Sequence, residues 1–317
     1  MKYSHSLHLV VLAMVMTCVA GCGTMIGYSR TPLTGANAEL VAAASVGDLA
    51  TVGRLVKAGV DINRKDEHGW DALMYAVEKR QLAVVDFLLS HGANPNTREN
   101  PKGNLYWTAK AWQSLSGRPA VMVATQRRRP DIVRRLIDAG ADVRVRTADG
   151  SSAFSFAEDF ETLKLFLQMG MDPNHRDGPD TTSDFASVLS GLGWPTPLIN
   201  AASRGDAPSV KLLLKVGADP NVRAPFFAWT PLQSVAIWGE PELAQALLDA
   251  GADINAADNK NQTALMNAAK KGRAAMVKFL LAAGANPNLK DELGQTALDH
   301  AIATNKSEIV QLFAPKR

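Results

Sequence analysis

Apolar residues recur along this chain in a unit of about 33 residues, and the clearest copy occupies residues 251–288. In the second half of that copy, apolar side chains fall on one face of a helix with 3.6 residues per turn, at Met276, Val277, Leu280 and Leu281. A shorter Ala-rich segment precedes this stripe and begins after Thr263, whose hydroxyl can cap a helix. The unit therefore predicts two short helices joined by a turn.

Glycines mark the end of this unit throughout the chain. Gly284 can take the left-handed conformation that ends a helix, and equivalent glycines lie at Gly59, Gly92, Gly140, Gly170, Gly217 and Gly251. Their spacings are 33, 48, 30, 47, 34 and 33 residues. We interpret these spacings as one period near 33, with two insertions of about 15 residues and one deletion of three.

Short triplets that can start a helix recur with the same period. Each begins with a residue that can cap a helix, and some carry Pro at the first helical position, where the missing N–H has no cost. The triplets are Asp71-Ala72-Leu73, Ser152-Ala153-Phe154, Thr196-Pro197-Leu198, Thr230-Pro231-Leu232, Thr263-Ala264-Leu265 and Thr296-Ala297-Leu298. The first helix of every unit is therefore expected to begin at such a triplet.

A 33-residue unit of two antiparallel helices, with Thr-Pro/Ala-Leu and Gly-Ala-Asp/Asn-x-Asn as punctuation, resembles an ankyrin repeat. The resemblance implies an all-α ankyrin-repeat solenoid over residues 39–317, with about eight helix-turn-helix repeats and short β-turn loops. Neither helix of a repeat can bury its apolar stripe alone, so the repeats must stack on their neighbours. A degenerate first repeat is expected to begin with a helix over residues 40–46.

The N-terminus carries a different signal. One positive residue, Lys2, is followed by an apolar run over residues 7–20, which is too short to span a bilayer. This pattern predicts a secretory signal peptide over residues 1–21. The next segment, residues 22–38, is rich in Gly, Thr and Ser and predicts a flexible tether.

The junction of these two segments is similar to the processing site of bacterial lipoproteins. Its residues are Val19-Ala20-Gly21-Cys22, and the resemblance implies that Cys22 becomes the lipidated first residue of the mature chain. The chain has only one other cysteine, Cys18, and it lies inside the signal, so a disulfide is not expected. Because Gly23 is not Asp, the resemblance further implies an outer membrane lipoprotein of the bacterial cell envelope that faces the periplasm. The alternative is an ordinary cleaved signal in which Cys22 is incidental.

Two insertions interrupt the repeats, near residues 97–118 and 178–194. The interval 97–146 holds eleven Lys or Arg against four Asp or Glu, whereas the interval 147–190 holds two against eight. We hypothesise that residues of this region bind a partner through aromatic contacts and charge. The residues are Tyr106, Trp107, Trp112, Arg127, Arg128, Arg129, Phe226 and Phe227. The alternatives are a satellite apolar cluster for the tryptophans and a solvated turn for the arginines, and Trp70 and Trp229 are interpreted as structural.

Catalytic and cofactor motifs are absent from the sequence. It has no H-E-x-x-H, no phosphate-binding G-x-x-x-x-G-K-S/T, no G-x-S-x-G and no paired-cysteine spacing. The formal charge of +3 does not indicate a nucleic-acid partner. We therefore expect no enzyme, no cofactor, no metal and no small-molecule substrate.

The remaining hypothesis is binding of another protein, whose identity the sequence does not give. A lipid-anchored, periplasm-facing ankyrin-repeat protein would present a concave face and loop tips to that partner. One specific form is an immunity-type inhibitor of a toxin or lipase effector. The alternative is a structural or protective envelope factor that stabilises a resident periplasmic enzyme.

Overall fold

The structure of the chain is a computed structural model that describes residues 33–99, 117–147, 150–177, 195–225 and 227–313. Several sequence predictions fall outside these ranges. They are the signal peptide, most of the tether, the second insertion and the site residues Cys22, Tyr106, Trp107, Trp112 and Phe226. The structure therefore leaves these predictions open.

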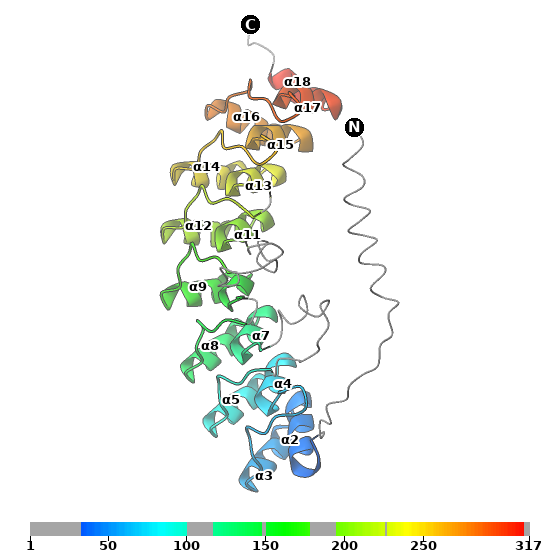
Figure 1. Cartoon of the computed structure of the whole chain (residues 1–317), viewed down its shortest axis with the longest axis vertical. Coiled ribbons are helices and arrows are strands. Elements are labelled where there is room, and N and C mark those ends of the chain that lie inside the picture. Colours follow the sequence, from blue (N-terminus) through cyan, green and yellow to red (C-terminus); the bar gives the residue numbers. More distant parts are fainter. Residues whose placement is uncertain (1–32, 100–116, 148–149, 178–194, 226, 314–317) are drawn as a thin grey trace, which may run out of the picture.

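Within the described residues, helix pairs follow one another and stack into an elongated solenoid that runs from α2 and α3 to α17 and α18 (Figure 1). The first helices of the repeats are α2 (Gly35–Val46), α4 (Ala72–Glu78), α7 (Ala120–Gln126), α11 (Pro197–Arg204), α13 (Pro231–Trp238), α15 (Ala264–Lys271) and α17 (Ala297–Ala303). The second helices are α3 (Leu49–Lys57), α5 (Leu82–Ser90), α8 (Pro130–Asp138), α9 (Phe160–Gln168), α12 (Ala207–Lys215), α14 (Pro241–Asp249), α16 (Ala274–Ala282) and α18 (Ser307–Leu312). In the fourth repeat a 3-10 turn, η1 (Phe154–Phe156), takes the place of the first helix. The predicted all-α solenoid is confirmed.

The core lies between neighbouring repeats. First helices pack on first helices and second helices on second helices, as α13 does on α15 and α16 on α18. The stripe residues that define the sequence period, such as Leu213 and Leu280, are completely buried in these contacts. Full burial of one such side chain contributes about 1.5–3 kcal/mol. Because this burial requires a neighbouring repeat, the solenoid is stable only as a contiguous stack.

The predicted helix caps form in most of the triplets. The side chains of Asp71, Thr230, Thr263 and Thr296 each accept the backbone N–H three residues ahead. Thr196 makes no such bond, although α11 still begins there. Because the cap satisfies one of the free N–H groups of the first turn, it helps to fix where the helix begins.

Two boundaries differ from the prediction. The first helix begins at Gly35, so residues 35–38, which were assigned to the tether, belong to the first repeat. These positions carry no large apolar residue that would show a period, but Ala is the strongest helix former. The predicted helix start at Ser152-Ala153-Phe154 gives only η1, because the chain must reach Asp159, the cap of α9, within three residues of Phe156.

The turn between the two helices of a repeat contains one residue in the left-handed region. This residue is glycine in four repeats, at Gly47, Gly205, Gly239 and Gly272, and it is Arg80, Arg128 or Asn305 in three others. In six of these seven turns the residue after it donates its N–H to a carbonyl five residues earlier, as Gln81 N does to Ala76 O and Arg129 N does to Ala124 O. This is a Schellman closure, in which glycine has no steric penalty and arginine does.

We expect Arg80→Gly to raise the free energy of unfolding by about 0.5–1 kcal/mol, because relief of the left-handed strain exceeds the added entropy of the unfolded chain. The matched change in the opposite direction is Gly239→Ala, whose new Cβ would lie 2.9 Å from Cδ of Arg273 in a left-handed position. We expect that variant to lose about 1–2 kcal/mol. Denaturant unfolding of both variants is the measurement, and a loss of stability in Arg80→Gly would contradict the assignment of strain.

Candidate protein-binding surface

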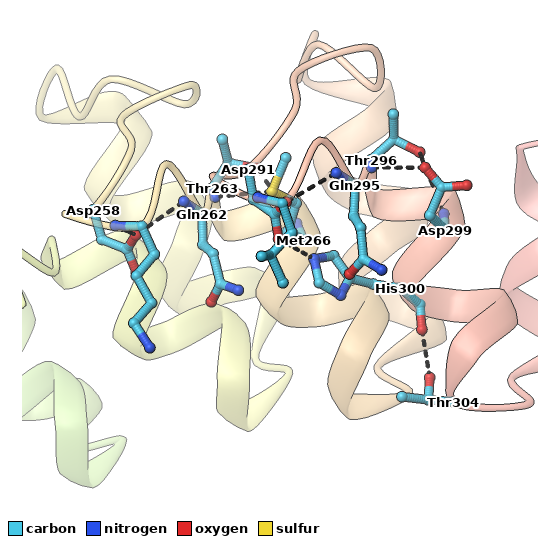
Figure 2. Close-up of polar contacts among 12 residues, drawn as sticks. Asp258, Gln262, Thr263, Met266, Asp291, Gln295, Thr296, Asp299, His300 and Thr304 are labelled. Atoms are coloured by element: carbon cyan, nitrogen blue, oxygen red, sulfur yellow. Dashed lines mark hydrogen bonds and ion pairs between the residues drawn. The ribbon is translucent and has the colours of Figure 1, made fainter. Parts of the chain in front are cut away.

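The loop that leads into the first helix of a repeat is here called the finger of that repeat, and in the second, third, fourth, sixth, seventh and eighth repeats the described residues of this loop pair as the stem of a hairpin. In the seventh finger, Asp258 N donates to Gln262 O at 3.0 Å, and in the eighth Asp291 N donates to Gln295 O at 2.9 Å. The carboxylate of the same aspartate accepts two N–H groups of the turn, which for Asp291 are those of Leu293 and Gln295 at 2.9 Å (Figure 2). An aspartate at this position therefore closes the finger from inside.

The eighth finger is also tied to the helix that follows it. His300 Nε2, on α17, lies 2.9 Å from Oδ2 of Asp291, and both side chains are almost fully buried (Figure 2). At the start of the same helix, the Thr296 and Asp299 side chains each accept the other residue's backbone N–H. These contacts hold the finger at a fixed angle to the helical layer.

Asparagines at the base of the fingers join successive repeats. The side chain donates to the carbonyl of the glycine that ends its own repeat and accepts an N–H two residues beyond, at the base of the next finger, as Asn221 does with Gly251 O at 2.9 Å and Asp253 N at 2.7 Å. Asn63, Asn96 and Asn174 make the same pair of bonds. The ladder breaks at Arg144, which stands in the asparagine position and donates only to Met169 O. The asparagine of the sequence signature is therefore a link between repeats, and the break falls at the shortened fourth repeat, between the fourth and fifth fingers.

Neighbouring finger tips are joined as well. Phe227 O in the sixth finger accepts Asn259 N at 3.0 Å, and Lys260 O in the seventh accepts Glu292 N at 3.0 Å. Side chains add further links, since Lys65 Nζ donates to Arg98 O at 2.8 Å between the second and third fingers. The row of fingers along the solenoid, joined in this way between the second and third fingers and from the sixth to the eighth, is here called the finger edge.

The first insertion is carried by the third finger. Glu99 N donates to Arg118 O at 3.1 Å, in the place where other fingers pair across a turn of only three or four residues. Residues 97–99 and 118–119 thus keep regular finger positions, and the insertion proper is narrower than the predicted 97–118 and comprises residues 100–117. The structure describes this stem and, of the insertion, Gly117 alone.

The stem is fixed by a charged cluster. Arg118 donates to Glu99 through Nε and Nη2, at 3.0 and 2.7 Å, and through Nη1 to Gln126 Oε1 at 2.6 Å. Trp70 of the second finger donates its indole N–H to Glu99 at 3.1 Å. The Arg118 and Glu99 side chains are only 22% and 10% exposed, so their bidentate pair is better shielded from solvent than a surface ion pair. This cluster links the stem to the second finger and to the end of α7.

Buried carboxylates lie at the bases of both insertions. Asp71, the cap of α4, accepts the Met74 N–H at 3.0 Å. It also accepts the hydroxyl of Thr97, the residue at which the stem of the third finger begins. Burial raises the pKa of Asp71, and the hydrogen bond from Thr97 opposes that shift. At the second base, Asp177 accepts the Ser152 N–H at 2.7 Å and lies 2.8 Å from the His175 ring.

The predicted arginines lie in the turn between α7 and α8. Arg127 pairs with Glu78, Arg128 with Glu158, and Arg129 with Asp131. The hydrogen bond to Glu78 raises the pKa of Arg127, and the hydrogen bond from Arg129 lowers the pKa of Asp131. The first two pairs join the third repeat to the second and the fourth, so these side chains connect repeats in addition to any role in binding.

The predicted site residues that the structure describes do not form one patch. Phe227 is 58% exposed on the sixth finger, with its ring centroid 5.8 Å from that of Trp229. Fingers lead into the N-terminal ends of the first helices, whereas the arginine turn follows the C-terminal end of α7. Arg127, Arg128 and Arg129 are therefore separated from the finger edge by the length of a helix.

Sequence interpretation missed some exposed apolar residues. Trp229, interpreted as structural, is 37% exposed beside Phe227, and Leu293 is 74% exposed at the tip of the eighth finger. Leu293 could have been found, because a large apolar residue between Glu292 and Gly294 has no place in a solvated turn. Trp229 could not, since its position before the helix start is compatible with burial.

No cluster of three His, Cys, Asp or Glu side chains in the part of the chain that the structure describes could hold a metal ion. Among the described helices, none has both the length and the apolar character needed to cross a membrane.

Family models of repeats match much of the chain. The model of ankyrin repeats in many copies matches residues 247–301, and the model of three ankyrin repeats matches residues 19–99 and 186–258. Together they cover residues 19–99 and 186–301, which is more than half of the sequence.

Similar curated proteins share the repeats and differ in the rest. The putative ankyrin repeat protein YahD of Escherichia coli (strain K12) is 26% identical over 220 residues, which are 68% of this chain and 96% of that protein. Mitochondrial disaggregase of Bos taurus is 29% identical over 160 residues, 44% of this chain but only 23% of that protein. Cyclin-dependent kinase 4 inhibitor B of Bos taurus is 40% identical over 84 residues, 26% of this chain and 63% of that protein. The match thus spans less than a quarter of the disaggregase.

Stacked repeats of this kind are typical of non-enzymatic proteins that bind other proteins, and the finger edge supplies a surface for such binding. The 33-residue period, the stacked helix pairs and the matched models agree with one another. The chain therefore belongs to the ankyrin-repeat family.

Proposed function

We propose that this chain is a lipid-anchored protein of the bacterial outer membrane that faces the periplasm and binds another protein through its finger edge. The observation that carries the proposal is the finger edge itself. The tips of its sixth, seventh and eighth fingers are joined by backbone hydrogen bonds, and it exposes Phe227, Trp229 and Leu293. A rigid edge with exposed aromatic side chains loses little conformational entropy when it binds a folded partner.

The anchor is supported by the sequence Val19-Ala20-Gly21-Cys22, which follows an apolar run of signal-peptide length. We expect the wild-type chain to incorporate a fatty-acid analogue and to fractionate with the outer membrane. Cys22→Ser should abolish the label and leave the chain soluble or unprocessed. Cys18→Ser is the matched control, because this cysteine is predicted to be removed with the signal. Labelling that persists in Cys22→Ser would refute the anchor.

We further propose that the partner is a toxin or lipase effector and that the chain acts as its immunity-type inhibitor. A membrane anchor would hold the inhibitor where a membrane-active toxin acts. One relative of this chain is named an inhibitor of a kinase, which supports inhibition as a use of such repeats. In this role the chain has no catalytic activity of its own.

Binding is proposed to rest on the insertion that the clamped stem carries and on the sixth finger. The residues are Tyr106, Trp107, Trp112, Phe226 and Phe227. The Arg118–Glu99 cluster supports this assignment, because it ties the stem of the third finger to the neighbouring finger and to α7. Preorganisation of this kind lowers the entropic cost of association.

The test is capture of a partner from envelope extracts by the wild-type chain and by variants. We expect Trp107→Ala with Trp112→Ala to lose the partner at unchanged melting temperature. Trp238→Ala is the control, because this tryptophan is 52% exposed at the inter-helix end of α13, away from the fingers. Capture that survives the double change, or that is lost equally in the control, would contradict the finger edge as the binding surface.

A second assay distinguishes the two kinds of partner. The captured protein, once identified, is assayed for lipase activity on phospholipid vesicles with and without the purified chain. Inhibition at a one-to-one ratio supports the immunity role. If the captured protein is a resident enzyme that the chain protects from unfolding, the immunity role is lost and the protective role replaces it.

A further inference from the structure

Arginine occupies a conformation that favours glycine in two adjacent repeats. Arg80 and Arg128 have φ of 63° and 53° in the inter-helix turns of the second and third repeats, where four other repeats place glycine. A polar residue kept in a strained backbone conformation raises the hypothesis that its side chain has a use. Arg128 has an internal use, because it pairs with Glu158. Within the described residues Arg80 forms no ion pair and is exposed.

The two turns lie side by side. Arg129 Nη1 donates to Arg80 O at 3.3 Å, and Arg127 pairs with Glu78 at the end of α4. Five cationic residues thereby line adjacent turns on the side of the solenoid opposite the fingers. We name this set the turn ridge, and it consists of Lys79, Arg80, Arg127, Arg128 and Arg129.

Carboxylates within the ridge neutralise only part of it. Glu78, Glu158 and Asp131 each pair with one arginine of the third repeat, which fixes the run in place. Lys79 and Arg80 are exposed and have no carboxylate partner among the described residues. The ridge therefore carries two uncompensated cations beside three arginines that are held by their own acids.

We propose that the turn ridge is a second binding site, which takes an acidic segment of the partner protein. The inference rests on the proposed function, since it assumes that the chain binds a protein, but it concerns a surface separate from the finger edge. Lys79 and Arg80 supply the free charge, and the planar guanidinium of Arg80 can take a carboxylate in bidentate fashion.

An acidic peptide fits this ridge better than a membrane surface does. Glu78, Asp131 and Glu158 lie among the cations, and they would be repelled by a dense layer of anionic headgroups. A peptide can place its carboxylates at Lys79 and Arg80 and avoid those acids.

The test uses the full chain carrying Cys22→Ser and a fluorescent peptide of ten glutamates as the probe. Lys79→Gln with Arg80→Gly removes two charges from the ridge. Lys270→Gln with Lys271→Gln is the matched control, since it removes two exposed charges from the corresponding turn of the seventh repeat. Binding is measured by fluorescence anisotropy in low and high salt, together with the melting temperature of each variant.

We expect the ridge variant to bind the peptide about three- to thirtyfold more weakly than the wild type, and the control to bind within about twofold of it. The difference should shrink in high salt. Because Arg80→Gly relieves strain, its melting temperature should not fall, so weaker binding would not reflect unfolding. Equal losses in the two variants, or no loss in either, would overturn the proposal.

Vesicles that contain phosphatidylglycerol test the alternative that the turn ridge binds an anionic membrane surface. Binding to them that depends on Lys79 and Arg80, without binding of the glutamate peptide, would assign the ridge to a membrane and overturn the acidic-segment proposal. Capture by the finger edge is scored separately with Trp107→Ala and Trp112→Ala. If the turn ridge fails to bind the peptide but partner capture depends on Trp107 and Trp112, the proposed function stands and only the ridge proposal is rejected. If neither result is obtained, both proposals are rejected.

Discussion

Leu280→Ala should lower the free energy of unfolding by about 2–5 kcal/mol. Leu280 lies on α16 with no exposed surface, between the second helices of neighbouring repeats. Its truncation removes apolar contacts on two sides and leaves a cavity that a stacked repeat can fill only by moving against its neighbour. Leu213→Ala on α12 should behave in the same way.

The control for this prediction is Leu293→Ala, which makes the same chemical change at a finger tip that is 74% exposed. Its effect on stability should stay within about 0.5 kcal/mol. Denaturant unfolding followed by far-UV circular dichroism gives both values. Similar losses for Leu280→Ala and Leu293→Ala would mean that the second helices do not pack as the stack requires.

Asp71→Ala should be the next most damaging change, with an expected loss of about 2–4 kcal/mol. The carboxylate caps α4 by accepting Met74 N, and it also accepts the buried Thr97 hydroxyl at the start of the stem. Removing it leaves both donors without their acceptor. Asp48→Ala removes a cap from the exposed start of α3, where water can replace it, so the loss should be smaller.

Asp71 also predicts a pH dependence. Burial raises its pKa above 3.8, so the folded chain holds this proton more tightly than the unfolded chain does. The stability that protonation contributes is fully present below pH 3.8 and is lost as the pH rises through the raised pKa. The Asn side chain of Asp71→Asn does not titrate. As the pH rises through the raised pKa, the wild type should therefore lose stability that the variant keeps, and the free energy of unfolding of Asp71→Asn should increase relative to that of the wild type. A relative stability that decreases with pH would contradict the assignment.

The repeat pattern predicted the fold because each step of it has a local physical cause. The stripe at Met276, Val277 and Leu280 fixes one helix face, and the left-handed glycine fixes where the unit ends. The Thr263 cap fixes where the next helix starts. These effects act within a few residues, so a single sequence contains them.

Features that depend on neighbouring repeats could not be predicted in this way. The 30-residue spacing from Gly140 to Gly170 indicated a deletion, but the replacement of a helix by η1 follows from where Asp159 must stand to cap α9. Likewise the Arg127, Arg128 and Arg129 run suggested a free charged patch, whereas pairing with Glu78 and Glu158 requires residues 49 and 30 positions away. The arginine run is separated from the fingers because α7 runs from the third finger to the arginine turn. A count of charges along the sequence does not contain this direction.

The candidate binding surface was predicted only in part. Phe227 was proposed because nothing in the repeat requires a bulky residue at a loop tip, and the structure exposes it beside Trp229. Whether it contacts a partner stays a prediction, as it does for Trp107 and Trp112. The clamp of Arg118 and Glu99 was not predicted, because the two residues flank a long insertion and only the finger hairpin brings them together.

Hydrogen exchange of the chain with and without its captured partner tests the central claim most directly. If the finger edge binds the partner, amide exchange should slow in residues 97–119 and 224–230, while the exposed ends of α12 and α14 keep their rates. Protection confined to the second helices, with unchanged exchange in both fingers, would contradict the account.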